Sequence, residues 1–284
     1  MIGIVVINKD KGFTSNDAVV KIKKLTGQKR VGHLGTLDPM ATGVLPVCLG
    51  KATRLFDRYL KKTKTYAAHF RFGMLTDTLD SEGVVLQKNG KIPDRASILE
   101  VLDSFRGKIM QIPPKYSAKN IGGVRAYKLA RLGEEVELAP RQVEVFKLEL
   151  LGQIDDETFE FEIECSAGTY IRSLGRDIGE ALDTCAVMTK LTRTRCGEFE
   201  LKDALPLEGL TKQKIENNLV SLESALKDLP QMTLTGDEFK RLMSGLKLMK
   251  SDSGEYLILF EKKVVGIGNV TNGAITLTTN LYED

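Results

Sequence analysis

Alternation of apolar and polar residues in three long segments is the feature that most constrains the fold of this 284-residue chain. The segments are Thr63–Gly73, Val143–Leu151 and Thr158–Ser166, and each pattern predicts a strand with one buried face. Apolar residues at helical spacing follow Asp94, and a second helical pattern begins at Gly168. Strands that bury only one face usually pair antiparallel. The sequence therefore predicts an α+β fold, with a large mixed, mainly antiparallel sheet flanked by helices.

The N-terminal region adds one strand and one helix to this body. Residues Gly3–Asn8 form a short apolar run, which predicts a strand. Either Thr14 or Ser15 can then cap a helix, and Gly27 is placed to end it.

The C-terminal stretch differs in character from the rest of the chain. After Pro230, GDEFKRLMSG predicts a short helix, EYLILFEKKVVGIGNV predicts a hairpin turning at Lys262 and Lys263, and AITLTTNL adds a strand. Such a unit is near the lower size limit of an independent hydrophobic core. We therefore expect two domains, a body over residues 1–229 and a small β-rich module over residues 230–284.

Composition argues against several classes of function. No run approaches the roughly 18 apolar residues of a membrane span, and the N-terminus does not resemble a signal peptide, so we expect a cytoplasmic protein with no membrane partner. Four cysteines without a CxxC pair and only two histidines make a zinc site improbable. Neither GxxxxGK[ST] nor GxGxxG after a strand occurs, so we expect no metal and no cofactor. Nothing in the sequence demands an oligomer, and we expect a monomer.

Basic residues gather locally although the formal net charge is only +3. Such clusters can bind nucleic-acid phosphates, but they are also typical of ordinary solvated surfaces. The clusters are Lys21, Lys23 and Lys24 with Lys29 and Arg30; Lys61, Lys62 and Lys64; and Arg193 with Arg195.

The segment GHLGTLDPMATG, Gly32 to Gly43, surrounds one carboxylate with residues that control the backbone. Pro39 favours an extended backbone at Asp38, and the glycines permit turns or close approach of another chain segment. An aspartate held on such a loop is a candidate nucleophile. An Asp-Pro pair that merely starts a turn is the alternative, and the segment taken alone favours the turn.

Four ordered segments together closely resemble the TruB family of tRNA pseudouridine synthases. They run from Arg30 to Leu55, Lys64 to Gly83, Pro113 to Arg131 and Cys165 to Gly179, and GTLDPMATG is the most specific of their motifs. The resemblance implies a pseudouridine synthase fold with an RNA-clamping insertion at about 107–140, where the sequence also indicates a short helix. The tail resembles the small PUA-type RNA-binding module of such enzymes.

The activity that this resemblance implies is isomerisation of uridine to pseudouridine in the T loop of tRNA, at tRNA position 55. The uridine is flipped out of the RNA, and no guide RNA, cofactor or obligate protein partner is required. One alternative is a relative guided by a separate RNA, and another is a non-catalytic RNA-binding protein that keeps the fold. Segment TDTLDSEG and the clamping insertion favour an enzyme that acts without a guide RNA over the guided relative.

The resemblance also implies the roles of the central side chains. Asp38 is the nucleophile, whether it attacks the sugar or the base. Arg172 is the positive partner of that carboxylate, because a buried carboxylate needs one to stay ionised. Tyr66 stacks on the target base and is a candidate to assist proton removal from C5, and Tyr170 supports the site. The residues alone favour a surface arginine on an amphipathic helix for Arg172, and they leave Tyr66 open as an aromatic residue on a half-buried strand.

Three further residues take roles only through the resemblance. Leu191 matches a leucine whose backbone contacts the uracil edge, and His33 matches the histidine that fills the space left by the flipped base. Lys9 matches a lysine in an N-terminal Lys-Pro-x-Gly pattern, but here Asp10 replaces the proline. Taken singly, Leu191 would be assigned to the core and His33 to a structural role.

Overall fold

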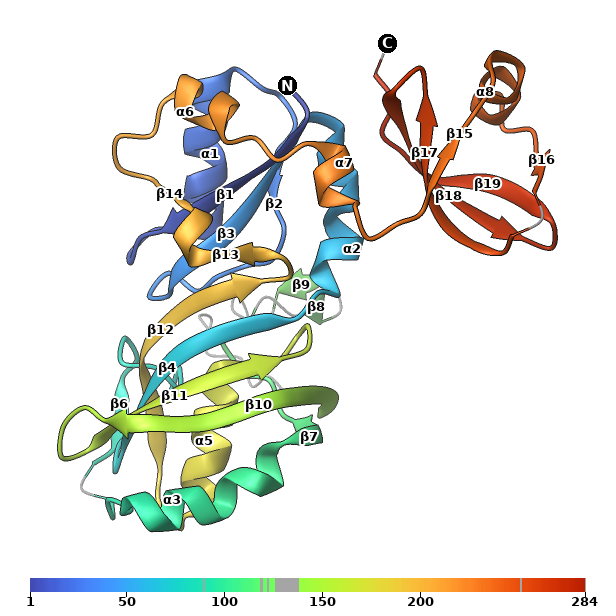
Figure 1. Cartoon of the computed structure of the whole chain (residues 1–284). Helices are drawn as coiled ribbons and strands as arrows, with labels where there is room; N and C mark the ends of the chain where they lie inside the picture. Colours follow the sequence, from blue (N-terminus) through green and yellow to red (C-terminus); the bar gives the residue numbers. More distant parts are fainter. Residues whose placement is uncertain (89, 118–119, 122, 126–137, 251, 284) are drawn as a thin grey trace. The chain divides into compact units, whose positions relative to one another are not determined.

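The computed structural model describes the whole chain except residues 89, 118–119, 122, 126–137, 251 and 284 (Figure 1). The chain divides into two compact units. The first comprises Met1–Asp38, Leu45–Leu60 and Lys202–Asp284, and the second comprises Pro39–Val44 and Lys61–Leu201. The central part of the predicted RNA-clamping insertion, with its expected helix, lies outside the described residues.

The second unit is built on an antiparallel sheet. Its strands, in the order in which they pair, are β12 (Ala186–Cys196), β4 (Lys64–Phe72), β11 (Thr158–Cys165), β10 (Arg141–Gln153) and β7 (Gly107–Gln111). The three segments with alternating patterns thus become β4, β10 and β11, as predicted. The strand β12 was not predicted, although it pairs with β4 along nearly its whole length.

One face of this sheet is apolar and covered by helices. The helices α5 (Ile171–Ala181) and α3 (Arg95–Leu102) lie on it (Figure 1). Phe70 of β4 and Phe161 of β11 meet there with their ring centroids 5.1 Å apart. Gly175 allows α5 to approach closely, because a Cβ atom at this position would lie 2.7 Å from the Phe70 ring.

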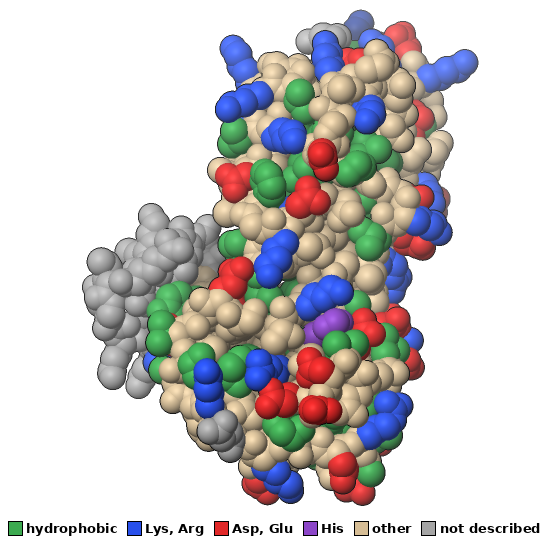
Figure 2. All heavy atoms as spheres, turned by 90° about the vertical axis from the view of Figure 1, so that its left-hand side faces the viewer, with side chains coloured by type: hydrophobic (Ala, Val, Ile, Leu, Met, Phe, Trp, Pro, Cys, Tyr) green, Lys and Arg blue, Asp and Glu red, His purple; other side chains and the backbone are tan. Residues whose placement is uncertain are grey.

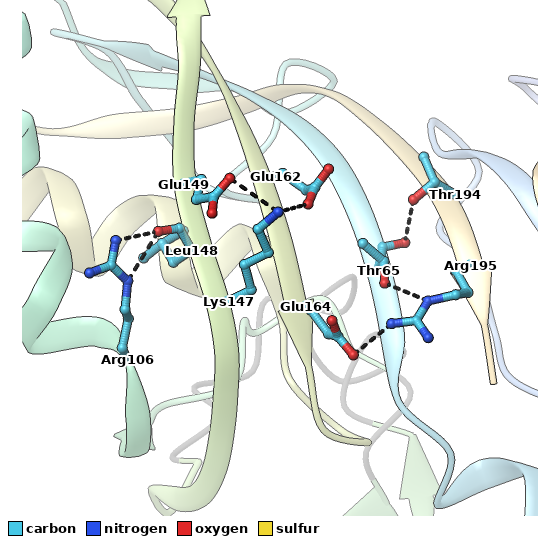
Figure 3. Close-up of polar contacts among 9 residues, drawn as sticks. All are labelled: Thr65, Arg106, Lys147, Leu148, Glu149, Glu162, Glu164, Thr194 and Arg195. Carbon is cyan, nitrogen blue, oxygen red and sulfur yellow. Dashed lines mark hydrogen bonds and ion pairs between the residues drawn. The ribbon is translucent and has the colours of Figure 1, made fainter.

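The opposite face of the sheet carries charged residues in pairs (Figure 3). Lys147 on β10 pairs with Glu162 on β11 and lies 3.1 Å from Glu149, and Arg195 on β12 lies 2.6 Å from Glu164 on β11. These side chains are partly exposed to solvent, and an ion pair at a protein surface adds at most about 1 kcal/mol. Alternation of the two faces therefore fixes the strand register more than the ion pairs do.

The remaining elements of the second unit are short. They are β5 (Leu75–Thr76), β6 (Val85–Gln87), η2 (Asp103–Phe105), β8 (Asn120–Ile121), β9 (Val124–Arg125) and β13 (Phe199–Glu200).

The first unit begins with β1 (Gly3–Lys9) and α1 (Ser15–Thr26). Thr14 caps α1 through a capping box with Asp17, and Gly27 ends the helix with a left-handed φ of 68°, as the sequence predicted. The strand β1 pairs parallel with β14 and is followed in the sheet order by β3, and β2 pairs antiparallel with β3. The parallel pairing of β1 with β14 makes the sheet mixed. The other elements of this part of the unit are β2 (Val31–His33), β3 (Thr42–Leu49), η1 (Gly50–Leu55), α2 (Phe56–Leu60), η3 (Leu201–Asp203), β14 (Leu205–Pro206), α6 (Lys212–Asn217) and α7 (Leu222–Ala225).

The C-terminal stretch forms a five-stranded sheet of its own, in the order β15-β17-β18-β19-β16. Its elements are β15 (Gln231–Thr233), α8 (Gly236–Met243), β16 (Leu248–Met249), β17 (Gly254–Phe260), β18 (Lys263–Thr271) and β19 (Ala274–Asn280). It has its own core, in which Phe239 of α8 stacks on Phe260 with ring centroids 4.2 Å apart. The predicted hairpin is present, but Glu261 and Lys262 form its turn, with φ values of 47° and 61°.

Glu238 of α8 is bonded to residues on both sides of the helix. Its carboxylate accepts hydrogen bonds from the backbone N–H of Thr235, at 2.9 Å, and from Lys250 Nζ, at 2.8 Å. The Lys250 hydrogen bond is the main cause that lowers the pKa of Glu238 from 4.5 to about 2. The ionised form is therefore favoured in the folded state.

We expect Glu238→Gln to lower the free energy of unfolding by about 1 kcal/mol near neutral pH, because the pair is partly exposed. Since the folded pKa is depressed, this stabilisation is present above about pH 4.5 and is lost as the pH falls toward 2. Chemical unfolding at about pH 7 and about pH 3 measures it. Glu216→Gln, in an exposed pair with Lys212 at 3.7 Å, is the control. Its difference from wild type in free energy of unfolding should be the same at both pH values. The role given to Glu238 would be contradicted if wild type and Glu238→Gln differed more in free energy of unfolding at about pH 3 than at about pH 7.

Among the described residues, no helix has the length and apolar character needed to cross a membrane.

Candidate active site

The backbone just before Asp38 is anchored to the start of α1. The Ser15 hydroxyl accepts a hydrogen bond from Leu37 N at 2.9 Å and donates one to Leu37 O at 3.2 Å. Ser15 and Leu37 are buried, whereas Asp38 is partly exposed. The arrangement therefore presents one accessible carboxylate from a fixed backbone. His33 ends the adjacent β2, opposite Val47 of β3, and is also partly exposed.

Lys9 closes the loop in which Asp10 replaces the family proline. Its side chain is fully buried, and Nζ donates to Asp10 O at 2.9 Å and to Phe13 O at 2.6 Å. Two carbonyl acceptors compensate for part of the cost of burying the ammonium group. The loop is thus held by Lys9 although the proline is absent, and Asp10 is exposed.

In the second unit, the segment that follows Asp38 is fastened to β12. Thr42 Oγ1 lies 2.9 Å from Thr192 Oγ1 and 3.4 Å from Leu191 O. Gly43 pairs with Arg193 in parallel register, and a Cβ atom at Gly43 would lie 2.3 Å from the Arg193 carbonyl oxygen. Leu191 itself is buried, so its side chain belongs to the core.

Gly43→Ala should lower the free energy of unfolding by about 2 kcal/mol or more, and it should also lower activity. The reason is the clash with the Arg193 backbone together with a φ of 102°, which L-residues rarely adopt. Gly236→Ala is the matched control, since its Cβ would meet nothing within 4 Å, and we expect a change below about 0.5 kcal/mol. Equal midpoints of chemical unfolding for the two variants would show that Gly43 is not needed for close packing.

Tyr66 is buried on β4, where its neighbours in register are Ile163 and Arg193. Burial raises the pKa of Tyr66 well above its ordinary value of 10.0, and Arg193 acts in the opposite direction. The phenol therefore stays protonated near neutral pH. Its hydroxyl can donate a hydrogen bond and its ring can pack against a planar group, but it is not a ready base in this state.

Arg172 is a buried residue near the start of α5, with only 6% of its surface exposed, which rules out the surface arginine that the sequence left open. Its guanidinium donates to Thr78 O and to Tyr116 O, both at 2.9 Å. Asp80 Oδ2 lies 3.4 Å from Arg172 Nη1, and this carboxylate also accepts from the Thr78 hydroxyl at 2.6 Å. Asp80 was not predicted from the sequence as a partner of Arg172, although both lie in segments that resemble the family.

A buried amide fixes the chain at Tyr170. Gln111 Oε1 accepts from Tyr170 N at 2.7 Å, and Gln111 Nε2 donates to Tyr170 O at 3.0 Å. Ser173 Oγ donates to Ile112 O at 2.8 Å. Arg172 lies between these two attachments, so its backbone position is determined on both sides. These bonds involve only the backbone of Tyr170, and the supporting role of its side chain stays a prediction.

The basic clusters seen in the sequence are not all available for phosphates. Arg193 is 1% exposed, so the expected cluster of Arg193 and Arg195 is wrong as a phosphate-binding surface. A register shift between Arg193 and Arg195 places them opposite Tyr66 and Thr65, which lie on opposite faces of β4. Arg195 therefore lies on the exposed face, where it pairs with Glu164 (Figure 3). Lys64 is also buried, and burial lowers its pKa. On the face drawn in Figure 2, positive and negative side chains are interspersed.

Among the described residues, no group of three or more His, Cys, Asp or Glu side chains is placed to hold a metal ion.

Comparison with known families gives a direct match. Residues 23–171 match the family model described as TruB family pseudouridylate synthase (N terminal domain), and residues 172–231 match the tRNA pseudouridylate synthase B C-terminal domain. The chain belongs to the TruB family of pseudouridylate synthases. The tRNA pseudouridine synthase B of Clostridium acetobutylicum is 39% identical over 95% of this chain and 96% of its own length. That of Francisella philomiragia is 41% identical over 96% of this chain and 92% of its own.

Solved structures support the same fold. An H/ACA RNP bound to a substrate RNA containing 2′-deoxyuridine has a chain with a TM-score of 0.73 at 25% identity, covering 99% of this chain and 85% of that one. A chain of a Cbf5-Nop10-Gar1 complex has a TM-score of 0.70 at 27% identity, with 98% and 79% covered. The predicted pseudouridine synthase fold is therefore confirmed.

Proposed function

We propose that this enzyme isomerises uridine to pseudouridine in the T loop of tRNA, at position 55, without a guide RNA. The observation that carries the proposal is 39–41% identity, over 95–96% of the chain, to proteins named tRNA pseudouridine synthase B. Identity to chains of the H/ACA RNP and Cbf5 complexes is only 25–27%. The stand-alone tRNA enzyme is thus favoured over the guided alternative.

The reaction is an isomerisation, so the protein does not have to supply or remove any atom. The N1–C1′ bond of uridine breaks, a C5–C1′ bond forms, the proton on C5 leaves, and N1 gains one. Atoms and electrons balance within the nucleotide. One nucleophile is sufficient, and we assign that role to Asp38, whose partly exposed carboxylate is on an anchored backbone.

We assign the remaining predicted residues, Lys9 among them, to substrate binding. Buried Tyr66 packs its ring against the flipped base, and Arg172 and Tyr170 maintain the charge and backbone of the site. The Leu191 backbone contacts the uracil edge, and His33 fills the vacated space in the RNA. Because burial raises the pKa of Tyr66, a neutral phenol is the form that meets the substrate.

The proposed domain organisation is a catalytic domain over residues 1–229, with the RNA-clamping insertion at about 107–140, and a PUA-like RNA-binding module over 230–284. The separate sheet and core of the C-terminal stretch support an independent module. We further propose tRNA as the partner, with no obligate protein partner, and action as a monomer in the cytoplasm.

The decisive experiment incubates the purified protein with an unmodified tRNA transcript and maps pseudouridine. We expect one pseudouridine at position 55, with no guide RNA added. A transcript with cytidine at position 55 is the matched control and should yield none. Binding of tRNA without any product would contradict the proposal and favour the non-catalytic alternative, and a requirement for added RNA would favour the guided one.

A further inference from the structure

Arg193 is a buried charge to which neither the family resemblance nor the proposed mechanism gives a role. It lies in the middle of β12 with 1% of its surface exposed, and it is among the largest fully buried side chains of the protein. Taking a guanidinium out of water is unfavourable unless specific partners offset the cost. The partners of Arg193 should therefore indicate what it does.

The first partner is the backbone that follows Asp38. Arg193 Nε donates to Val44 O at 2.7 Å, and Arg193 pairs with Gly43 in parallel register. The close approach of Gly43 to the Arg193 backbone adds a second attachment at the same place. Arg193 is thus bonded to the segment through which the Asp38 loop continues into β3.

The second partner is Tyr66. The two residues face each other across the antiparallel strands β12 and β4, so their side chains lie on the same face of the sheet. Burial is the main cause that raises the pKa of Tyr66, while the charge of Arg193 and a hydrogen bond from it lower that pKa. A guanidinium can only donate, so the phenol oxygen accepts from Arg193 and the phenol proton remains available to another acceptor.

We infer that Arg193 is a positioning residue of the proposed reaction, which holds the Tyr66 hydroxyl and the backbone at Val44 in a fixed relation to each other. The inference rests on the proposed function, since it concerns the same reaction. A planar guanidinium suits this task because its donors point in fixed directions toward two acceptors at once, whereas a lysine ammonium is a compact group on a flexible stem.

A contact with RNA phosphate is the alternative role for an arginine in this family. The burial of Arg193 argues against it, because phosphate contacts require an exposed donor. Arg195, two residues along the same strand, provides the contrast: it is on the exposed face, where it pairs with Glu164 and donates to the Thr65 hydroxyl (Figure 3). The two arginines therefore allow a matched comparison of a buried and an exposed charge.

The test uses the full-length protein with Arg193→Lys, Arg193→Gln and Arg193→Met, and Arg195→Gln as the control. In single-turnover assays with tRNA, we expect the Arg193 variants to lose about 100-fold in the rate of pseudouridine formation, as misplaced reacting groups do. The dissociation constant for tRNA and its salt dependence should stay within about threefold of wild type, because no phosphate contact is removed. Arg195→Gln should react within about twofold of wild type.

A double-mutant cycle with Tyr66→Phe separates positioning from a general structural role. If Arg193 acts through the Tyr66 hydroxyl, adding Arg193→Gln to the Tyr66→Phe variant should lower the rate of pseudouridine formation by at most about threefold. An undiminished 100-fold loss there would overturn the inference, and so would wild-type rates in the single variants or failure of all three to fold. Wild-type protein that makes no pseudouridine would instead overturn the proposed function itself.

Discussion

Replacing Asp38 by asparagine is expected to abolish pseudouridine formation, with a loss of about 10⁴-fold or more in single-turnover rate. The substitution keeps the size of the side chain but exchanges the carboxylate for an amide that does not attack carbon. The loss should be the same whether the wild-type carboxylate attacks the sugar or the base, because both routes require the ionised oxygen. Affinity for tRNA should remain within about tenfold, since no phosphate contact is removed.

Rate and affinity for the Asp38 variant should be measured on the same transcript. Asp57→Asn, on the exposed surface of α2, is the control and should leave both quantities unchanged. The neighbouring backbone is held by Ser15 through Leu37, so the fold should survive the substitution and the unfolding midpoint should stay near that of wild type. Retention of more than a few per cent of the activity would exclude Asp38 as nucleophile.

The strands β4, β10 and β11 were predictable because each buries only one face. Their residues alternate between an apolar side under α3 and α5 and a charged side in solvent. Helix boundaries were predictable for a similar reason, since Thr14, Asp94 and Gly27 act through local backbone hydrogen bonds and torsion angles. In each case the information lies within a few residues of the element.

The strand β12 was not predictable from the same rules. Its sequence AVMTKLTRTRC places a charged residue at Arg193, a buried position, so the apolar alternation is interrupted. The pairing of β12 with β4 brings together segments more than a hundred residues apart. Tertiary context, and not local pattern, decides that this segment is a strand.

Only some residues of the candidate site were predictable from the sequence. Asp38 is marked by the glycines and proline around it, and the family resemblance supplied Tyr66 and Arg172. Asp80 and Arg193 have no such mark, because a buried charged residue looks like a surface one in a sequence. Only their burial and partners in the folded structure, Arg172 for Asp80 and Val44 for Arg193, show that they are part of the interior.

Arg172→Ala is expected to have a large effect on both stability and activity. It removes two hydrogen bonds to carbonyl oxygens and leaves the buried carboxylate of Asp80 without this ion-pair partner. Breaking a buried pair on one side typically costs about 3–5 kcal/mol. We expect a matching fall in the free energy of unfolding and a loss of about 10³-fold in pseudouridine formation. Arg176→Ala, one turn along α5 in a less buried pair with Asp177, should cost less than Arg172→Ala.

The two effects of Arg172→Ala can be separated through Asp80. Asp80→Asn removes the negative charge, so the double variant Arg172→Ala/Asp80→Asn should recover part of the stability that Arg172→Ala loses, since no uncompensated carboxylate remains. If Arg172 serves only the fold, activity should recover together with stability. Because we assign Arg172 to the substrate site, we expect activity to stay low in the double variant while the unfolding midpoint rises. Parallel recovery of both would restrict Arg172 to a structural role and leave Asp38 to be stabilised by other groups.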